Sequence, residues 1–317
     1  MIGEKMMARL FIIVATVFCM SGASGCMLFQ KTTWCGTSSP KPPVVLAQDA
    51  SLDDVVRAVN NNNAQKRTLV ANDARITIEG VPVSLRSNIA YEYPKKYRVT
   101  GEAVVSKEFD IGSNNELFWV WIKQDPRNAV YFGRHDQYES NPVRDSFQID
   151  PNWLIESMGM TVFQPSSMEE HRLVSRTAEG NWKIETKRQT AMGPYIKYTT
   201  VDGKTACVLM QELVNPSGRL VASAVTPSHA LDATTGITYP ETVDMLFSMQ
   251  GQQLNMRISM GRVQFNQSSP FLADVFTIPN YPGYQMVDIC GQSGTPFIQQ
   301  VSGSTPATTN VNAPQVY

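Results

Sequence analysis

The first patterned stretch of the chain has the period of a helix. Between Ser51 and the asparagines at 60–63, apolar residues stand at i, i+3, i+4 and i+7: Leu52, Val55, Val56 and Val59. Asp54 follows Ser51 at the spacing of a capping box. The pattern therefore predicts one amphipathic helix that begins after Ser51 and ends in the asparagine run.

From Thr68 onward the apolar period changes to two, which is typical of β-strands. Turn-forming residues separate the alternating runs at Glu79-Gly80, Asp125-Pro126, Glu179-Gly180, Asp202-Gly203, Pro216-Ser217-Gly218 and Gly251. This arrangement predicts a mainly β (α+β) domain whose strands, about eleven or twelve of them, form an antiparallel meander.

The clearest hairpin joins residues 242–249 to residues 253–265. One face of its two arms is apolar and holds Val243, Met245, Phe247, Met249, Leu254, Met256, Ile258 and Met260. The other face carries Asp244, Ser248, Arg257 and Ser259. One side of this sheet is therefore expected to face water and the other an apolar interior.

A second helix is predicted at residues 150–158. Asp150 suits its N-cap, Pro151 its first position and Gly159 the residue after its end. Its apolar residues surround most of the helix: Trp153, Leu154, Ile155 and Met158. Such a helix has to lie over an apolar surface.

The strand at residues 116–123 is apolar on both faces. Leu117, Trp119 and Trp121 share one face, and Phe118, Val120 and Ile122 share the other. Either both faces are covered, or one of them faces a cavity.

The N-terminal segment has the pattern of an export signal. Arg9 precedes an apolar run from Leu10 to Met20, which is too short to span a bilayer as a helix. The small residues at 21–25, followed by Cys26, resemble the lipobox of bacterial lipoproteins, although Ala23 stands where that motif prefers Leu. The resemblance implies a diacylated Cys26 at a membrane, with the outer membrane favoured because Met27, and no Asp, follows it. A plain signal peptide cleaved nearby is the alternative.

These boundaries divide the chain into four parts. Residues 1–25 are the predicted signal peptide, 26–50 the lipidated cysteine and a flexible Pro/Ser/Thr-rich tether, and 51–290 the folded domain. The tail from 291 to 317 has no Asp, Glu, Lys or Arg, and is expected to be disordered.

The polar residues give no pattern of catalysis. A net charge of -1 and a pI of about 6.3 argue against a nucleic-acid partner. His135, His171 and His229 have no second ligand at metal spacing, and a structural role is favoured for them. Gly203-Lys204-Thr205 reads as a hairpin turn and not as a phosphate loop. We therefore expect no enzyme activity, no metal and no cofactor.

Export and lipidation would leave three cysteines in the mature chain, Cys35, Cys207 and Cys290. An odd number allows at most one internal disulfide. Buried or incidental free thiols are an equally good reading.

Three short motifs resemble those of the LolA/LolB superfamily of lipoprotein carriers and acceptors, in the correct order over residues 51–289. The segment at 93–98 resembles its Pro-x-x-aromatic-Arg strand, with Tyr93, Pro94, Tyr97 and Arg98 at the motif positions. The segment at 113–119 resembles its SDGKxLW turn, and Phe265-Asn266 with the segment at 274–283 resembles its closing motif through Phe276, Pro279 and Gly283. The segments at 112–121, 134–137 and 150–155 also resemble uncharacterised planctomycete lipoproteins.

The resemblance implies a curved antiparallel half-barrel of about eleven strands whose concave apolar face accepts acyl chains under short lidding helices. In the soluble carrier an Arg before the motif proline helps to latch the lid, and Tyr93 stands there in this chain. This departure argues against lid gating of that kind. A diacylated protein does not readily cross between membranes, so the acceptor-like or locally acting member is the better analogue. The candidates for lining the cavity are Trp119, Trp121, Trp153, Leu154, Met158, Met245, Phe247, Met249, Met256, Ile258 and Met260.

Two hypotheses follow. In the first, the protein is a lipid-anchored envelope module that binds an acyl lipid or lipoprotein and handles it at the outer membrane. In the second, it is a structural or assembly lipoprotein that contacts envelope proteins through its outer surface or tail. An open concave face would favour the first, and a filled one the second.

Overall fold

The computed structural model describes residues 40–138, 141, 151–163, 169–190, 193–249, 252–267 and 272–291. The predicted signal peptide, Cys26, Asp150 and residues 292–317 lie outside these ranges. Within them, no helix has the length and apolar character needed to cross a bilayer.

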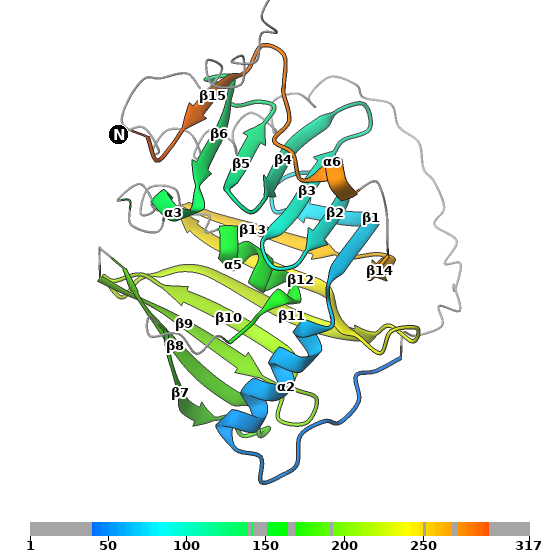
Figure 1. Ribbon diagram of the computed structural model, residues 1–317, viewed down its shortest axis with the longest axis vertical. Helices are drawn as coiled ribbons and strands as arrows, with labels where there is room; N and C mark the ends of the chain where they lie inside the picture. Colours follow the sequence, from blue (N-terminus) through cyan, green and yellow to red (C-terminus); the bar gives the residue numbers. More distant parts are fainter. Residues whose placement is uncertain are drawn as a thin grey trace, which may run out of the picture.

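The described chain is dominated by a single sheet (Figure 1). Its strands are β1 (Thr68–Ile78), β2 (Leu85–Glu92), β3 (Lys96–Glu102), β4 (Lys107–Ser113), β5 (Leu117–Ile122), β6 (Ala129–Arg134), β7 (Glu169–Arg176), β8 (Trp182–Thr190), β9 (Gly193–Val201), β10 (Val208–Val214), β11 (Leu220–Leu231), β12 (Thr238–Met249), β13 (Gln252–Ser259), β14 (Val263–Phe265) and β15 (Gln285–Asp288). The helices are α2 (Leu52–Ala64), α3 (His135–Tyr138), α5 (Pro151–Ile155), the π-helix η1 (Glu156–Met160) that continues it, and α6 (Leu272–Val275).

The strand order is β15-β6-β5-β4-β3-β2-β1-β13-β12-β11-β10-β9-β8-β7, and β14 also pairs with β1. The pairs described are antiparallel except for β15 with β6. The mainly β antiparallel prediction is confirmed, but the sheet has fifteen strands within the described residues and not the eleven or twelve expected. Some turns contain no glycine or proline, such as Ala103 to Ser106 between β3 and β4, so the pattern of turn residues could not reveal them.

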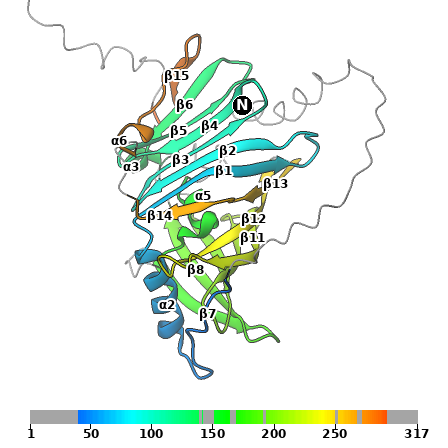
Figure 2. The same ribbon diagram turned by 90° about the vertical axis from the view of Figure 1, so that its right-hand side faces the viewer.

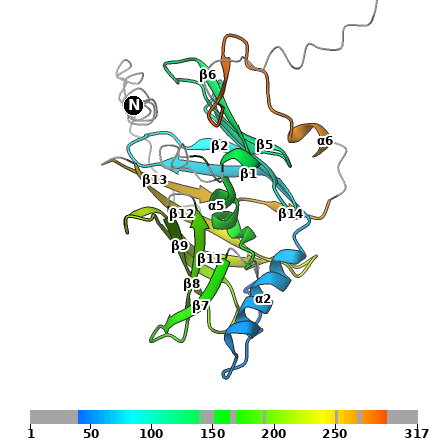
Figure 3. The same ribbon diagram turned by 60° about the vertical axis from the view of Figure 1, so that its left-hand side comes forward.

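The sheet is strongly curved, and α5 and η1 lie on its concave side between the β1–β5 half and the β8–β12 half (Figures 2 and 3). The main core gathers there, with side chains from β1, β2, β3, β5, β11, β12 and β13 packed against α5 and η1. Helix α2 lies toward one end of the sheet and packs Val55 and Val59 against Trp182 and Ile184 of β8.

The β12–β13 hairpin has the predicted faces. Val243 pairs with Ile258, Met245 with Met256 and Phe247 with Leu254 on the inner face. On the outer face the Arg257 guanidinium donates to the Asp244 carboxylate at 2.5 and 2.8 Å.

The segment at 40–50, which the sequence assigns to the tether, lies against the domain. The N–H groups of Val45 and Leu46 donate to the Lys204 carbonyl at 2.8 and 3.0 Å, and Leu231 N–H donates to the Pro40 carbonyl. The Leu46 side chain is buried beside α2. Packing onto the domain therefore begins before residue 51.

Candidate functional site

The concave core brings together most of the residues that the sequence selected as cavity lining. Those buried in this one cluster are Trp153, Leu154, Met158, Met245, Phe247, Ile258 and Met260, and Met256 packs against them half-buried. Met249 ends β12, and its side chain lies outside the description.

Trp119 and Trp121 lie elsewhere. They point to the opposite face of β5, where Ile278, Tyr281 and Tyr284 cover them. The Trp121 and Tyr281 rings stack with centroids 3.8 Å apart. Phe118, Val120 and Ile122, not the two tryptophans, are the β5 residues that reach the concave core. Both faces of this strand are covered, as one of the two sequence readings required.

Helix α5 and η1 fill the hollow with their own side chains. The Trp153 ring meets the Phe247 ring edge-on at 5.5 Å. Ser157 Oγ donates to the Leu154 carbonyl at 2.7 Å and lies 3.9 Å from Met245 Sδ. Gly159 has φ +90°, and a Cβ there would come within 2.5 Å of Pro240 Cδ. Glycine therefore permits both the turn and the close approach of η1 to β12.

The contacts of η1 with β9 and β10 are polar. Lys197 Nζ of β9 lies 2.6 Å from Glu156 Oε2. Gln211 Nε2 of β10 donates to the Glu156 carbonyl and to Thr161 Oγ1, each at 3.0 Å. The concave face thus has an apolar half and a polar half.

The asparagine run of α2 holds the chain around η1. Asn60 exchanges two hydrogen bonds with the backbone of Phe163, at 2.7 and 2.8 Å. Asn62 does the same with the backbone of Thr238, at 3.0 Å each, and Asn63 donates to the Thr161 carbonyl. The run lies inside α2 and connects it to the end of η1 and to the start of β12.

Lys66 is a buried lysine at the same junction. Its ammonium donates to Asn63 Oδ1 at 2.7 Å and to the Gly159 carbonyl at 2.8 Å. Burial lowers the pKa of Lys66 from 10.5 to about 7. The lysine therefore ties the left-handed glycine of η1 to the end of α2.

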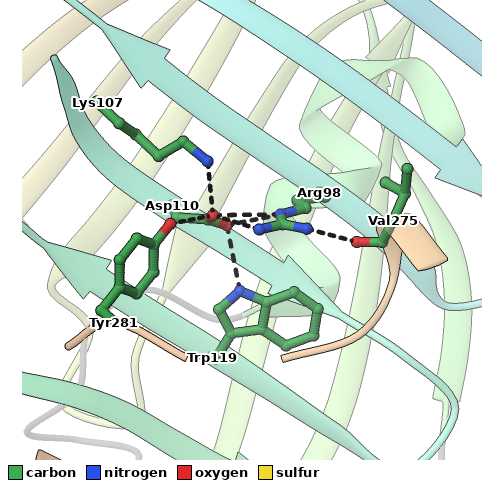
Figure 4. Close-up of polar contacts among 6 residues, drawn as sticks. All are labelled: Arg98, Lys107, Asp110, Trp119, Val275 and Tyr281. Atoms are coloured by element: carbon green, nitrogen blue, oxygen red, sulfur yellow. Dashed lines mark hydrogen bonds and ion pairs between the residues drawn. The ribbon is translucent and has the colours of Figure 1, made fainter. Parts of the chain in front are cut away.

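On the opposite face of the sheet, the Asp110 carboxylate of β4 is the centre of a second polar network (Figure 4). Arg98 binds it with two nitrogens, the closest contact being 2.6 Å, and Arg98 Nη1 donates to the Val275 carbonyl at 2.9 Å. Tyr281 Oη donates at 2.6 Å, Trp119 Nε1 donates at 3.2 Å, and Lys107 Nζ lies 3.4 Å away.

Burial by itself would raise the pKa of Asp110, but the hydrogen bonds and charge of Arg98, with Tyr281 and Lys107, outweigh it and hold that pKa below its usual value. Burial and the hydrogen bond to Asp110 raise the pKa of the Tyr281 phenol. The network is thus an ionised carboxylate under neutral and basic donors. It fastens the segment after α6 to the sheet, and its geometry serves attachment.

The residues matched to family motifs lie on both faces of the sheet. Tyr97 is buried in the concave core, and Arg98 beside it points to the other face. Phe276 is buried against Ala90, and Pro279 and Gly283 lie in the same segment after α6. Tyr93, joined to Pro94 by a cis peptide bond, is 46% exposed.

Other candidates take structural places. His135 Nε2 lies 2.9 Å from Ser113 Oγ at the end of β4. Asp202 Oδ1 accepts hydrogen bonds from Lys204 N, Thr205 N and Thr205 Oγ1 in the turn between β9 and β10. Cys207 and Cys290 are free thiols, and Cys35 lies outside the described ranges. Within the residues described, no group of three or more His, Cys, Asp or Glu side chains is placed to bind a metal ion.

Sequence reasoning missed Asp110, Lys66, the Glu156–Lys197 pair and the role of the asparagines. Asp110 did leave a signal, since it stands among Phe109, Ile111 and Gly112 in a strand where a charge needs a buried partner.

The fold resembles those of several solved structures. The chain is structurally similar to LolA-superfamily and lipoprotein-sorting domains. A LolA superfamily protein from Nitrosomonas europaea aligns with a TM-score of 0.47 and 10% identity, over 72% of this chain and 98% of that one. A putative outer membrane lipoprotein-sorting protein domain from Vibrio parahaemolyticus gives 0.46 and 7%, over 69% and 95%. A DUF1329 family protein from Desulfovibrio piger gives 0.46 and 11%, over 71% and 95%. No protein-family model and no curated protein matches the sequence.

Proposed function

We propose that this protein is a non-enzymatic lipoprotein of the cell envelope, anchored through Cys26 at the outer membrane and facing the periplasm, whose concave face binds acyl chains of a lipid or lipoprotein. The observation that carries the proposal is the apolar inner face of β11, β12 and β13, which is covered by a separate short helical segment. The motif resemblance of the sequence supports the same reading.

The covering segment is attached to the sheet by side chains. Apolar contacts such as Trp153 with Phe247, and a few polar ones, hold α5 and η1 over the hollow. Moving them exposes apolar surface without breaking the backbone ladder of the sheet. Methionines at 245, 256 and 260 suit a surface that packs against chains of varied shape.

Lipid mass spectrometry tests this proposal on the exported Cys26→Ser protein, purified without detergent. We expect a bound acyl lipid or lipopeptide that is lost in Met256→Lys, because an ammonium on the inner face disfavours apolar contact. Ser259→Lys places the same charge on the outer face and should keep the lipid. Circular dichroism establishes that both variants fold. Equal loss in both variants would contradict the assignment of faces.

A second candidate function is docking of an envelope protein on the outer surface. It is favoured by the filled hollow, since Trp153, Met158 and Met245 are each almost fully buried by the chain itself. Val104 and Val105, 99% and 92% exposed at the β3–β4 turn, add apolar surface outside. A stable, lipid-free protein in the experiment above would favour this function.

A further inference from the structure

From β9 to β13, the inner face changes from polar to apolar along rows of directly opposed residues. One row crosses the strands from β8 to β13 through Ile184, Thr199, Gln211, Ala224, Met245 and Met256. Its neighbour crosses through Thr186, Lys197, Leu213, Ala222, Phe247 and Leu254. At about 4.8 Å between strands, β9 and β13 are about 19 Å apart along these rows. That length exceeds the thickness of one leaflet, which is half of a hydrocarbon core about 30 Å thick.

The polar end of the rows has unused hydrogen-bonding capacity. Thr199 and Gln211 lie opposite each other on β9 and β10, 0% and 2% exposed. Thr199 Oγ1 and Gln211 Oε1 are buried without a hydrogen-bond partner. Buried polar atoms in this state are costly. The Thr199 hydroxyl can donate to an anion, whereas Gln211 Oε1 only accepts and Gln211 Nε2 already donates to the Glu156 carbonyl and to Thr161 Oγ1, so Thr199 supplies the free donor at this end.

A cation stands beside these atoms. The Lys197 side chain, 12% exposed, is occupied by the carboxylate of Glu156, which is 26% exposed and belongs to the segment that covers the hollow. Lys197 is therefore within reach of an anion from solvent once Glu156 turns away. The covering segment also places apolar Trp153 over Phe247, at the apolar part of the rows. The Glu156 carboxylate and the Trp153 ring of this segment therefore occupy the places that the headgroup and the acyl chain of a bound amphiphile would take.

We propose that Lys197 and Thr199 form a headgroup site for an oxyanion, so that the acyl ligand is an anionic amphiphile and Glu156 is its internal competitor. This inference rests on the proposed acyl-chain site. The oxyanion is a carboxylate or a phosphate, and both are acceptors for an ammonium and a hydroxyl.

Displacement of the neutral dye Nile red from the exported Cys26→Ser protein tests the proposal with laurate, dodecyl phosphate and dodecanol. Lys197→Met should weaken the binding of the preferred anion at least about tenfold, the size of a lost charge-assisted hydrogen bond, and change dodecanol binding less than twofold. Glu156→Gln should strengthen anion binding severalfold. The stronger of the two anions identifies the headgroup class.

Lys183→Met is the matched control. Lys183 lies on β8 and pairs with Glu212 at 3.0 Å on the outer face, so its loss should leave both affinities unchanged. Thr199→Val carries the same test if Lys197→Met does not fold, with weaker anion binding and unchanged dodecanol binding expected. Equal effects on anion and alcohol, or weaker anion binding in Glu156→Gln, would overturn the headgroup site. Displacement by none of the three amphiphiles would instead refute the proposed function.

Discussion

The Asp110 side chain joins three separate parts of the chain by hydrogen bonds. Its carboxylate is fully buried, and it accepts hydrogen bonds from Arg98 of β3, Trp119 of β5 and Tyr281 of the segment after α6. Arg98 continues to the Val275 carbonyl. Two sequence segments that resemble family motifs, far apart along the chain, are thus fastened to each other through a residue in neither of them.

Asp110→Asn should lower the free energy of unfolding by about 3–5 kcal/mol, because it leaves the partly buried Arg98 without its counter-charge. Chemical denaturation of the variant and the parent protein at neutral pH measures the difference. Asp244→Asn breaks an exposed ion pair with an arginine on the outer face and should lower the free energy of unfolding far less than Asp110→Asn.

The difference in the free energy of unfolding between the parent protein and Asp110→Asn should depend on pH. The pKa of Asp110 is lowered in the folded state, so its stabilisation is present above the ordinary value of 3.8 and is lost as the pH falls through the folded pKa. The difference between the two proteins should therefore shrink in acid. A difference that stays constant down to the acid transition would contradict an ionised Asp110.

Individual residues were predictable where their pattern alone determines their place. The β12–β13 methionines alternate with Asp244 and Arg257, so their face was fixed by period two. Trp119 and Trp121 were ambiguous because both faces of β5 are apolar. Which face met the hollow depended on the segment at 276–284, about 150 residues further along the chain.

At the scale of elements, α2 serves as a connector. The sequence predicted its start, and Ser51 and Asp54 do form a capping box. The prediction that it ends within the asparagine run was wrong, because the helix continues to Ala64. Asparagine is a weak helix former by itself, and here its amides are paired with the backbones of Phe163 and Thr238. Those tertiary contacts outweigh the local preference.

Asn60→Ala should lower the free energy of unfolding by about 1–3 kcal/mol, since the buried N–H and carbonyl of Phe163 lose their partner. Hydrogen exchange should show faster exchange at Phe163. Asn61→Ala, at an exposed position of the same helix, should have neither effect. Protection of Phe163 that is unchanged in Asn60→Ala would show that the helix does not hold this segment.

For the whole molecule, the proposed anchor and the folded domain are separable. Cys26→Ser should abolish labelling by radioactive palmitate and move the protein from the membrane to the soluble fraction, because two acyl chains are what hold it. Cys35→Ser, nine residues further along the printed sequence, should leave both readouts unchanged. Label retained in Cys26→Ser would place the modification elsewhere.

The antiparallel architecture could be predicted because turn residues and period two recur through the chain. The parallel pairing of β15 with β6 could not, since it joins a four-residue strand to one more than 150 residues earlier. The grouping of polar side chains at the β9–β10 end of the inner face could not be predicted either. Lys197, Thr199 and Gln211 come from two neighbouring strands, and only the register places them together with Glu156.

The two outermost strands of the sheet, β7 and β15, do not pair with each other. In a closed barrel the number of strands and their stagger set the diameter. This sheet is open, so a small change of twist at each strand pair widens or narrows the space inside the curve, while the backbone hydrogen bonds between the strands stay intact. The charged residues Arg172 and Arg176 on the edge strand β7 disfavour pairing of a strand from another protein with this edge. The width of the space inside the curved sheet can thus change without the loss of backbone hydrogen bonds.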